Sequence, residues 1–115
     1  MDVVRPELDI AVRQDASGET VVALRGEIDI GTVSRLTDAV EAALAEAPDR
    51  LVLDMAKVTF CDSQGLGTLV VLNRAATRAR TNLILMNLGD FLSRLLNVTG
   101  LRQAFLIREE RESPE

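Results

Sequence analysis

The chain has 115 residues, a formal net charge of −5, and 47% hydrophobic and 27% charged residues. This composition predicts one soluble globular domain, and an acidic chain without a dense basic cluster is not expected to bind nucleic acid. Because the chain has no histidine and its single cysteine is Cys61, it cannot form an internal disulfide, and we expect no metal site and no cofactor. No apolar run reaches the length of a membrane span, and residues 1–6 lack the layout of a signal peptide. A cytoplasmic protein without membrane insertion is therefore predicted.

Apolar residues recur along the chain with the period of strands in some segments and of helices in others. The first two strands, separated by a turn at 15–18, form a predicted hairpin. The apolar strand at 51–55 is expected to be buried on both faces. Asp29 or Thr32 is placed to cap the first helix, and Gly100 to end the third helix in a left-handed conformation. In chain order the predicted elements are strands 8–13 and 20–24, an exit segment 26–29, helix 33–47, strand 51–55, a connection 56–61, helix 63–80, strand 82–87, helix 91–99 and strand 104–107.

Strands that alternate with helices require crossover connections, which favour parallel pairing. The order of elements therefore predicts an α/β fold with a mostly parallel or mixed five-stranded sheet, an N-terminal β-hairpin and about three packed helices. Neither a repeat nor a linker divides the sequence. We expect a lead-in at 1–7, one domain at 8–107 and a charged C-terminal tail at 108–115 that frays.

The segment 60–67, Phe-Cys-Asp-Ser-Gln-Gly-Leu-Gly, stands where an apolar strand stops and a helix begins. It places the Ser63 hydroxyl, with Asp62 before it and two glycines behind it, at a predicted helix N-terminus. Backbone N–H groups point outward there and the helix dipole favours negative charge, so the position suits a phosphate group. The adjacent Cys61 follows apolar residues and is interpreted as a small buried hydrophobe rather than a reactive thiol.

An enzyme built on Ser63 would need a base, and without histidine that base could be only a carboxylate, a lysine or a terminal amine. Asp62 is adjacent, but neighbouring residues at a helix start point in different directions, and Lys57 alone does not make a Ser–Lys dyad. No dinucleotide fingerprint or phosphate-binding loop is present, and we predict that the chain is not an enzyme. A purely structural interpretation is that Asp62 and Ser63 cap the helix and Gly65 permits close packing. Capping and phosphorylation do not exclude each other.

Residues 53–67 resemble the central signature of STAS domains, specifically that of the bacterial anti-sigma factor antagonists. Upstream, the segment 24–29 (Leu-Arg-Gly-Glu-Ile-Asp) is similar to a second signature of the family, which precedes the first helix. The predicted order of elements is also similar to the family's, and the resemblance covers roughly residues 8–107. Two features depart from it: Gln64 stands where many members have a second serine, and the final helix of many members is missing at 108–115.

The resemblance implies a regulatory binding protein that works by partner switching. In the family, the serine after the motif aspartate is phosphorylated by an anti-sigma factor that is also a serine kinase, and here that serine is Ser63. The unphosphorylated antagonist binds the anti-sigma factor and frees the sigma factor, and a PP2C-type phosphatase restores this state. The implied partner-binding residues are Asp29, Asp62, Ser63, Gln64, Gly65, Leu66 and Gly67, the segment 27–32, and Asn73 and Arg74 on the exposed face of the second helix.

Three other functions stay open on the sequence. One is a STAS scaffold or regulatory module in a stress-sensing complex or a transporter system, which the size of the assembled complex would distinguish from an antagonist. Another is a small-ligand or nucleotide-binding module, which calorimetry with GTP and ATP would detect. The third is an enzyme whose ester or phosphoester turnover is abolished by Ser63→Ala.

Overall fold

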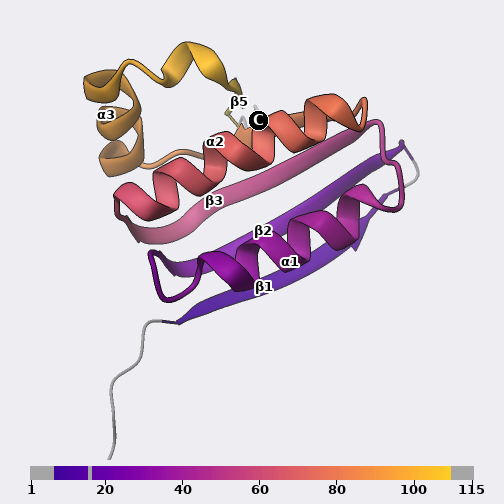
Figure 1. The fold of residues 1–115 in the computed structure, drawn as a ribbon, viewed down its shortest axis with the longest axis horizontal. Helices are drawn as coiled ribbons and strands as arrows, with labels where there is room; N and C mark the ends of the chain where they lie inside the picture. The colour runs from indigo at the N-terminus through magenta and orange to yellow at the C-terminus, as the bar shows by residue number, and fades with distance from the viewer. Residues whose placement is uncertain (1–6, 16, 110–115) are drawn as a thin grey trace, which may run out of the picture.

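The structure, a computed structural model, describes residues 7–15 and 17–109. Along these residues five strands and three helices follow one another, and a short 3-10 turn precedes the last strand (Figure 1). The elements are β1 (Leu8–Gln14), β2 (Glu19–Ile28), α1 (Val33–Leu44), β3 (Arg50–Cys61), α2 (Ser63–Arg78), β4 (Asn82–Met86), α3 (Asp90–Thr99), η1 (Arg102–Ala104) and β5 (Leu106–Arg108). None of the described helices is long and apolar enough to cross a membrane.

The strands form one mixed sheet in the order β1-β2-β3-β4-β5. β1 and β2 are antiparallel, as the predicted hairpin requires, and β2 to β5 run parallel. Each of the three parallel crossovers leads to the neighbouring strand, always toward β5. Because such crossovers are right-handed, the three helices pack on one face of the sheet. Figure 1 shows α1 and α2 side by side across that face. The predicted α/β class, mixed five-stranded sheet, hairpin and three helices are confirmed.

The core lies between the helices and the sheet. In β3, Leu51 and Leu53 belong to the cluster under the helices, Val52 belongs to a second cluster on the opposite face, and all three are fully buried. This confirms that the strand is buried on both faces. Burial of each such side chain contributes about 1.5–3 kcal/mol. The largest fully buried side chains are Leu8, Leu24, Ile28, Leu36, Leu51, Leu53, Met55, Leu69, Leu72, Leu83, Leu85 and Leu96.

β2 and β3 are both longer than the sequence predicts. β2 continues to Ile28 and β3 to Cys61, and the two extensions pair with each other until Ile28 lies beside Cys61. Two register shifts interrupt this pairing, one of them at Gly26, whose φ of 121° is a conformation that residues with a side chain rarely adopt. Most side chains in the extension of β3 are exposed, so the apolar periodicity stops before the strand does. The sequence pattern therefore could not predict the true end of β3.

Several element ends also differ from the prediction. α1 ends at Leu44, and Ala47 has a φ of 56°, outside the helical region. β5 begins later than predicted because residues 102–104 form η1, and the sheet therefore extends into the expected tail as far as Arg108. The rest of that tail from 110 onward lies outside the described residues. The left-handed end of α3 at Gly100, with a φ of 76°, is confirmed.

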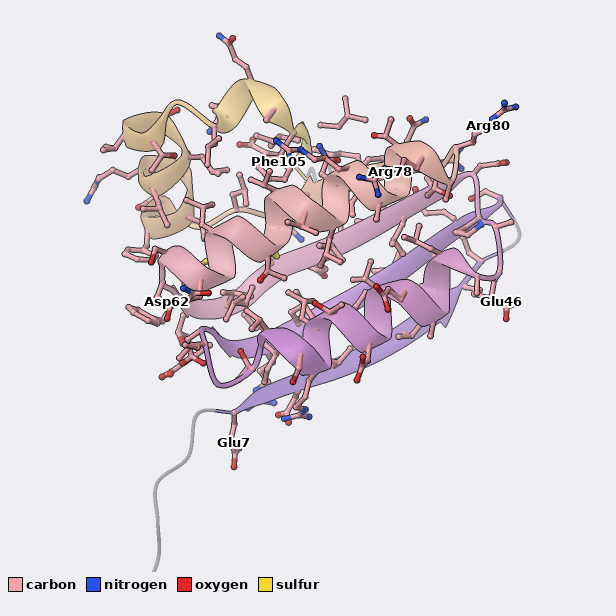
Figure 2. The ribbon with its side chains drawn as sticks, in the orientation of Figure 1. Glu7, Glu46, Asp62, Arg78, Arg80 and Phe105 are labelled. Atoms are coloured by element: carbon pink, nitrogen blue, oxygen red, sulfur yellow. The ribbon has the colours of Figure 1, made fainter. Side chains whose placement is uncertain are left out.

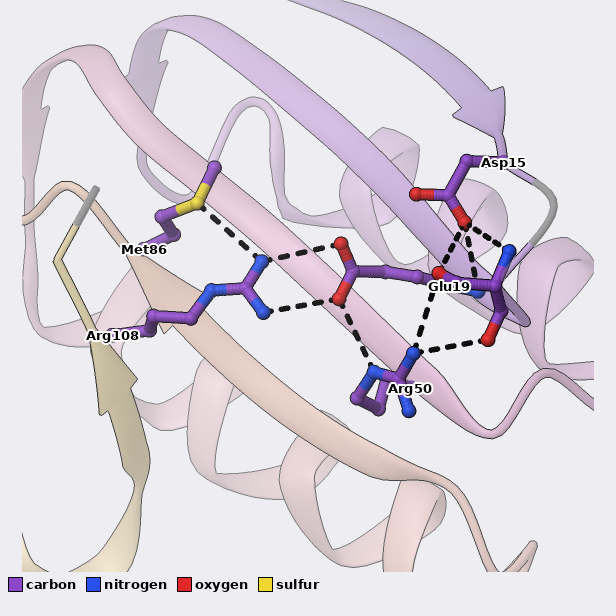
Figure 3. A network of polar contacts seen from close by, with 6 residues as sticks. Asp15, Glu19, Arg50, Met86 and Arg108 are labelled. Atoms are coloured by element: carbon purple, nitrogen blue, oxygen red, sulfur yellow. Dashed lines mark hydrogen bonds and ion pairs between the residues drawn. The ribbon is translucent and has the colours of Figure 1, made fainter. Parts of the chain in front are cut away.

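The other face of the sheet has no described helix over it, yet part of it is buried. Long polar side chains cover this part: Arg108 donates to both carboxylate oxygens of Glu19, at 3.0 and 3.2 Å, and Arg50 Nε donates to Glu19 Oε2 at 3.2 Å. We call these three residues the Glu19 strap, which joins β2, β3 and β5 (Figure 3). The side chains of the strap shield a small apolar cluster from water, and their charges are paired with one another. The cluster comprises Val21, Val52, Ile84 and Met86.

Replacing Glu19 by glutamine is expected to lower the free energy of unfolding by about 1–2 kcal/mol at neutral pH, because the charge-assisted hydrogen bonds of the strap are lost. Hydrogen bonds from Arg108 and then from Arg50 hold the pKa of Glu19 below its ordinary value of 4.5. Such a carboxylate contributes stability that is complete above the unfolded-state pKa and is lost as the pH falls through the folded-state pKa. The difference between wild type and Glu19→Gln should therefore shrink below pH 4.5.

Urea denaturation over a pH series measures this difference. Glu46→Gln is the matched control, since Glu46 is exposed and forms no ion pair with any described residue. It should change the free energy of unfolding by less than about 0.5 kcal/mol. An equal loss in the two variants, or a loss in Glu19→Gln that does not depend on pH, would contradict the role of the strap.

Candidate functional site

The segment singled out by the sequence lies where β2 and β3 end side by side and α2 begins. The backbone N–H of Asp62 donates to the carbonyl oxygen of Ile28, the last residue of β2, at 3.1 Å. Asp62 keeps an extended backbone as the N-cap residue, and α2 starts at Ser63. Figure 2 shows Asp62 at one end of α2 and Arg78 near the other. An acidic cap and a basic last turn both stabilise the dipole of this helix.

Both oxygens of the Asp62 carboxylate accept hydrogen bonds from backbone N–H groups. Oδ1 accepts from Gly65 N at 2.8 Å in the first turn of α2, and Oδ2 accepts from Ile30 N at 3.3 Å in the loop after β2. One side chain thus joins the start of α2 to the loop that leads into α1. Among the described residues no hydrogen bond connects this carboxylate to the Ser63 hydroxyl, so Asp62 is not placed as a base that activates Ser63.

Asp29 and Thr32 order the loop after β2. Asp29 Oδ1 accepts from Gly31 N at 2.9 Å, and the Thr32 hydroxyl donates to the Glu27 carbonyl oxygen at 2.8 Å. Thr32 is the N-cap residue of α1 by position, but neither predicted cap binds an N–H group of that helix through its side chain. Within the described part of the chain no group of three or more histidine, cysteine, aspartate or glutamate residues could hold a metal ion.

Ser63 is the first residue of α2 and is exposed. It lines a shallow hollow of about 450 Å³ between α1 and α2, together with Thr37 of α1 and Val71 of α2. The backbone N–H groups of Ser63 and Gln64 have no acceptor among the described residues. A hydroxyl and two available N–H groups therefore share one surface at the positive end of the helix dipole.

Gly65 allows the first turn of α2 to approach the strand ends. A Cβ atom at this position would fall onto the Ile28 carbonyl oxygen, and would lie 2.8 Å from Ile28 Cγ2 and 3.0 Å from Cys61 Sγ. Cys61 is buried at this contact. Desolvation, with the charges of Asp62 and Asp29 adding to it, raises the pKa of its thiol to about 12. The interpretation of Cys61 as a buried packing residue is confirmed.

The predicted partner-binding residues divide into an exposed and a buried group. Ser63, Gln64, Gly67 and Arg74 are exposed on α2. Ser63 and Arg74 lie on the same face of the helix, about three turns apart. Asp62 is half-buried between the two groups. The buried members, which position the site without forming its surface, are Asp29, Gly65 and Leu66.

Asn73, which the sequence places on the exposed face of α2, makes a contact with another element there. Its side chain is half-buried, and its Nδ2 donates to the Ala104 carbonyl oxygen at 2.8 Å. Asn73 therefore joins α2 to η1 and holds the connection between α3 and β5. The helical period alone could not show this, because the side of α2 on which Asn73 lies is covered by a segment about 30 residues later in the chain.

Three exposed apolar residues near the site form what we call the apolar rim: Ile30, Phe60 and Phe91. The three are 72%, 42% and 48% exposed. Ile30 lies in the predicted partner segment 27–32, whereas sequence reasoning missed Phe60 and Phe91 as surface residues. The N–H of Ile30 binds Asp62, and the rings of Phe60 and Phe91 stack with their centroids 6.1 Å apart. Phe60 and Phe91 are two of the three aromatic residues in the chain. Their rarity was the feature of the sequence that could have pointed to this surface. Exposed apolar clusters of this kind are typical of protein interfaces.

Comparison with known proteins identifies the family. A family model described as "Mlab, STAS domain" matches residues 12–108. The chain therefore belongs to the STAS domain family. An anti-sigma-B factor antagonist from Listeria monocytogenes is 28% identical over 101 residues, which cover 88% of this chain and 89% of that protein.

Solved structures share the fold. A crystal structure of an anti-sigma factor antagonist from Mycobacterium paratuberculosis matches with a TM-score of 0.78 and 29% identity, over 89% of this chain and 86% of that one. The unphosphorylated form of the anti-sigma factor antagonist SpoIIAA matches with a TM-score of 0.74 and 19% identity over 90% of each chain, a likeness of fold alone. The resemblance inferred from the two signatures is confirmed, since the chain is a STAS domain similar to anti-sigma factor antagonists.

The variant Gly65→Ala is expected to lower the free energy of unfolding by about 1–3 kcal/mol, because the added methyl group overpacks against the ends of β2 and β3. Gly67→Ala is the matched control, since a Cβ atom there meets nothing within 4 Å and alanine is favoured inside a helix. It should raise the free energy of unfolding by about 0.5–1 kcal/mol. Urea denaturation of both variants measures the difference, and equal effects would contradict the close approach at Gly65.

Proposed function

We propose that this chain is an anti-sigma factor antagonist that binds an anti-sigma factor serine kinase and is released when that kinase phosphorylates Ser63. The sigma factor is free while the antagonist holds the kinase, and a PP2C-type phosphatase returns the antagonist to its binding state. The similarity to proteins named anti-sigma factor antagonists supports the class of function. The placement of Ser63 supports the mechanism.

The observation that carries the proposal is the exposed Ser63 residue at the start of α2, beside a carboxylate whose oxygens are already bound. A phosphoacceptor must be reachable by the active site of another protein, and Ser63 meets this requirement. A serine that performs chemistry itself needs a base, whereas Asp62 is engaged by the N–H groups of Gly65 and Ile30. This geometry favours a residue that is modified by a partner.

A phosphate on Ser63 would be tolerated by α2. It adds about −1.5 to −2 charges at the helix N-terminus, where the dipole favours negative charge. The N–H groups of Ser63 and Gln64, which lack acceptors among the described residues, are available as donors for the phosphate oxygens. Phosphorylation is therefore expected to change the surface around Ser63 and to leave the helix folded.

The unfavourable effect of the phosphate falls on the complex with the kinase. A partner surface that fits the Ser63 hydroxyl beside Asp62 must accommodate a bulky dianion after phosphorylation, and unmatched charge at an interface costs several kcal/mol. Each 1.4 kcal/mol changes the affinity tenfold. The apolar rim supplies hydrophobic contact area next to this position. A few apolar anchors around one charge-bearing residue provide both affinity and a means of release.

Incubation with ATP and the anti-sigma factor kinase of the same genome should place one phosphate on Ser63, located by mass spectrometry of peptides. Ser63→Ala should bind the kinase and resist release by ATP, whereas Ser63→Asp should bind at least about tenfold more weakly. Ser34, an exposed serine in the first turn of α1, provides the matched controls: Ser34→Ala and Ser34→Asp should bind like the wild type. A phosphate on another residue, or equal binding by Ser63→Ala and Ser63→Asp, would contradict the mechanism. Treatment with a PP2C-type phosphatase should restore binding.

The apolar rim gives a separate prediction for the same complex. Ile30→Ser should weaken kinase binding by roughly tenfold, because truncation of an apolar anchor near the centre of an interface costs about 1–2 kcal/mol. Val98→Ser on α3 is the matched control, since Val98 is as exposed as Ile30 but lies outside the apolar rim. Calorimetry with the unphosphorylated chain measures both affinities. Equal effects of the two substitutions on the affinity would show that the apolar rim is not part of the interface.

A further inference from the structure

Among the described strands, the two at the edges of the sheet differ in length. β5 at one edge has 3 residues, and β1 at the other has 7. No described strand pairs with the outer side of β1, which forms the lower border of the sheet in Figure 1. Such an edge presents unpaired backbone N–H and C=O groups, and a long edge is a template for a further strand.

The register of the hairpin shows which backbone groups of β1 are unpaired. Hydrogen bonds from Glu27 N to Glu7 O and from Asp15 N to Glu19 O, both 3.1 Å long, join odd-numbered residues at the two ends of the hairpin. Bonded and non-bonded pairs alternate along an antiparallel ladder, so the odd-numbered residues of β1 bind β2. The residues whose N–H and C=O groups point outward are Leu8, Ile10, Val12 and Gln14.

The side chains of β1 are arranged symmetrically about Ala11. On the helix-free face, Asp9 precedes it by two residues and Arg13 follows it by two. Both are exposed, and neither forms an ion pair with a described residue. On the helix face, Ile10 and Val12 flank Ala11, and Val12 is 51% exposed. The strand is therefore complementary to a second copy of itself that runs in the opposite direction.

We propose that β1 of one protomer pairs antiparallel with β1 of its partner across a two-fold axis at Ala11, which joins the two sheets into one continuous sheet. In this register Asp9 of each protomer faces Arg13 of its partner, so the contact contains two ion pairs. Ile10 of each protomer faces Val12 of its partner, and these are the residues whose backbone groups point outward. The small Ala11 side chain meets its own copy in a close, non-hydrogen-bonded pair on the axis. This proposal does not rest on the proposed function.

The charge pattern selects both the occupant and the register. A parallel partner in register would place Asp9 against Asp9 and Arg13 against Arg13. An antiparallel partner with its two-fold axis at Asp9 or at Arg13 would also place that residue against its own copy. Like charges directly opposite each other destabilise a sheet. A slip of one residue would turn one sheet over and place Asp9 against Val12. In two-fold dimers the same surface patch of each protomer pairs with its own copy, as β1 does here.

Sedimentation equilibrium of the full chain tests the dimer and should show a reversible monomer–dimer equilibrium. Asp9→Arg and Arg13→Asp each convert both attractive pairs into repulsive ones, and each should raise the dissociation constant roughly tenfold or more. The double variant should return the dissociation constant to within about threefold of the wild type, because its pairs are again opposite in charge. A wild-type chain that is monomeric at every soluble concentration would overturn the proposal, as would single variants that dimerise like the wild type.

A cysteine on the axis tests the register. Ala11→Cys brings two Cα atoms to about 4.5 Å, within the range of a disulfide, whereas Gln14→Cys in the same register leaves them about 20 Å apart. Cys61 does not compete, since it is buried and its thiol pKa is raised to about 12. Mild oxidation should therefore convert Ala11→Cys to a covalent dimer and leave Gln14→Cys uncrosslinked. No crosslinking of Ala11→Cys, or equal crosslinking of both variants, would overturn the proposed register.

Discussion

The contact of the first turn of α2 with the ends of β2 and β3 sets the geometry of the site. Gly65 removes the side chain that would collide with the Ile28 carbonyl oxygen, and the Asp62 N–H group then binds that same oxygen. This close approach lets the Asp62 carboxylate, which caps the helix at Gly65 N, also reach Ile30 N. The position of Ser63 is therefore fixed by neighbouring groups that are themselves buried or bound. Its exposure is a consequence of that packing.

Most of the fold could be predicted from the sequence because each helix has one apolar face and the central strands contain apolar runs. The errors fall where structure depends on a partner distant in sequence. The extensions of β2 and β3 are stabilised by pairing with each other, while most of their side chains face water and follow no period. Arg108 was assigned to the tail because a charged residue near the end of a chain is usually solvated, but it covers Met86 and binds Glu19.

The site was predictable in part for a related reason. A serine after an aspartate at a strand–helix junction is a local pattern, so the position of Ser63 and the cap at Asp62 follow from a few residues. The hydrogen bond of Asn73 could not be predicted, since its partner Ala104 comes from another element. The sequence does not reveal that Phe60 and Phe91 of the apolar rim are exposed, because they fit the apolar patterns of a strand and a helix and only the tertiary arrangement leaves them at the surface. Local chemistry can be inferred from sequence spacing, whereas a surface assembled from distant segments cannot.

A rigid site also limits how a phosphate can act. A ligand or modification shifts a conformational equilibrium only if it interacts differently with two states. The first turn of α2 is held by Asp62 on both sides and packs against strand ends at Gly65, and these contacts favour the one arrangement that the structure shows. The added charge can also be received by the N–H groups of Ser63 and Gln64, which favours the existing conformation. The proposed phosphorylation of Ser63 would then change binding through its own charge and volume at the surface.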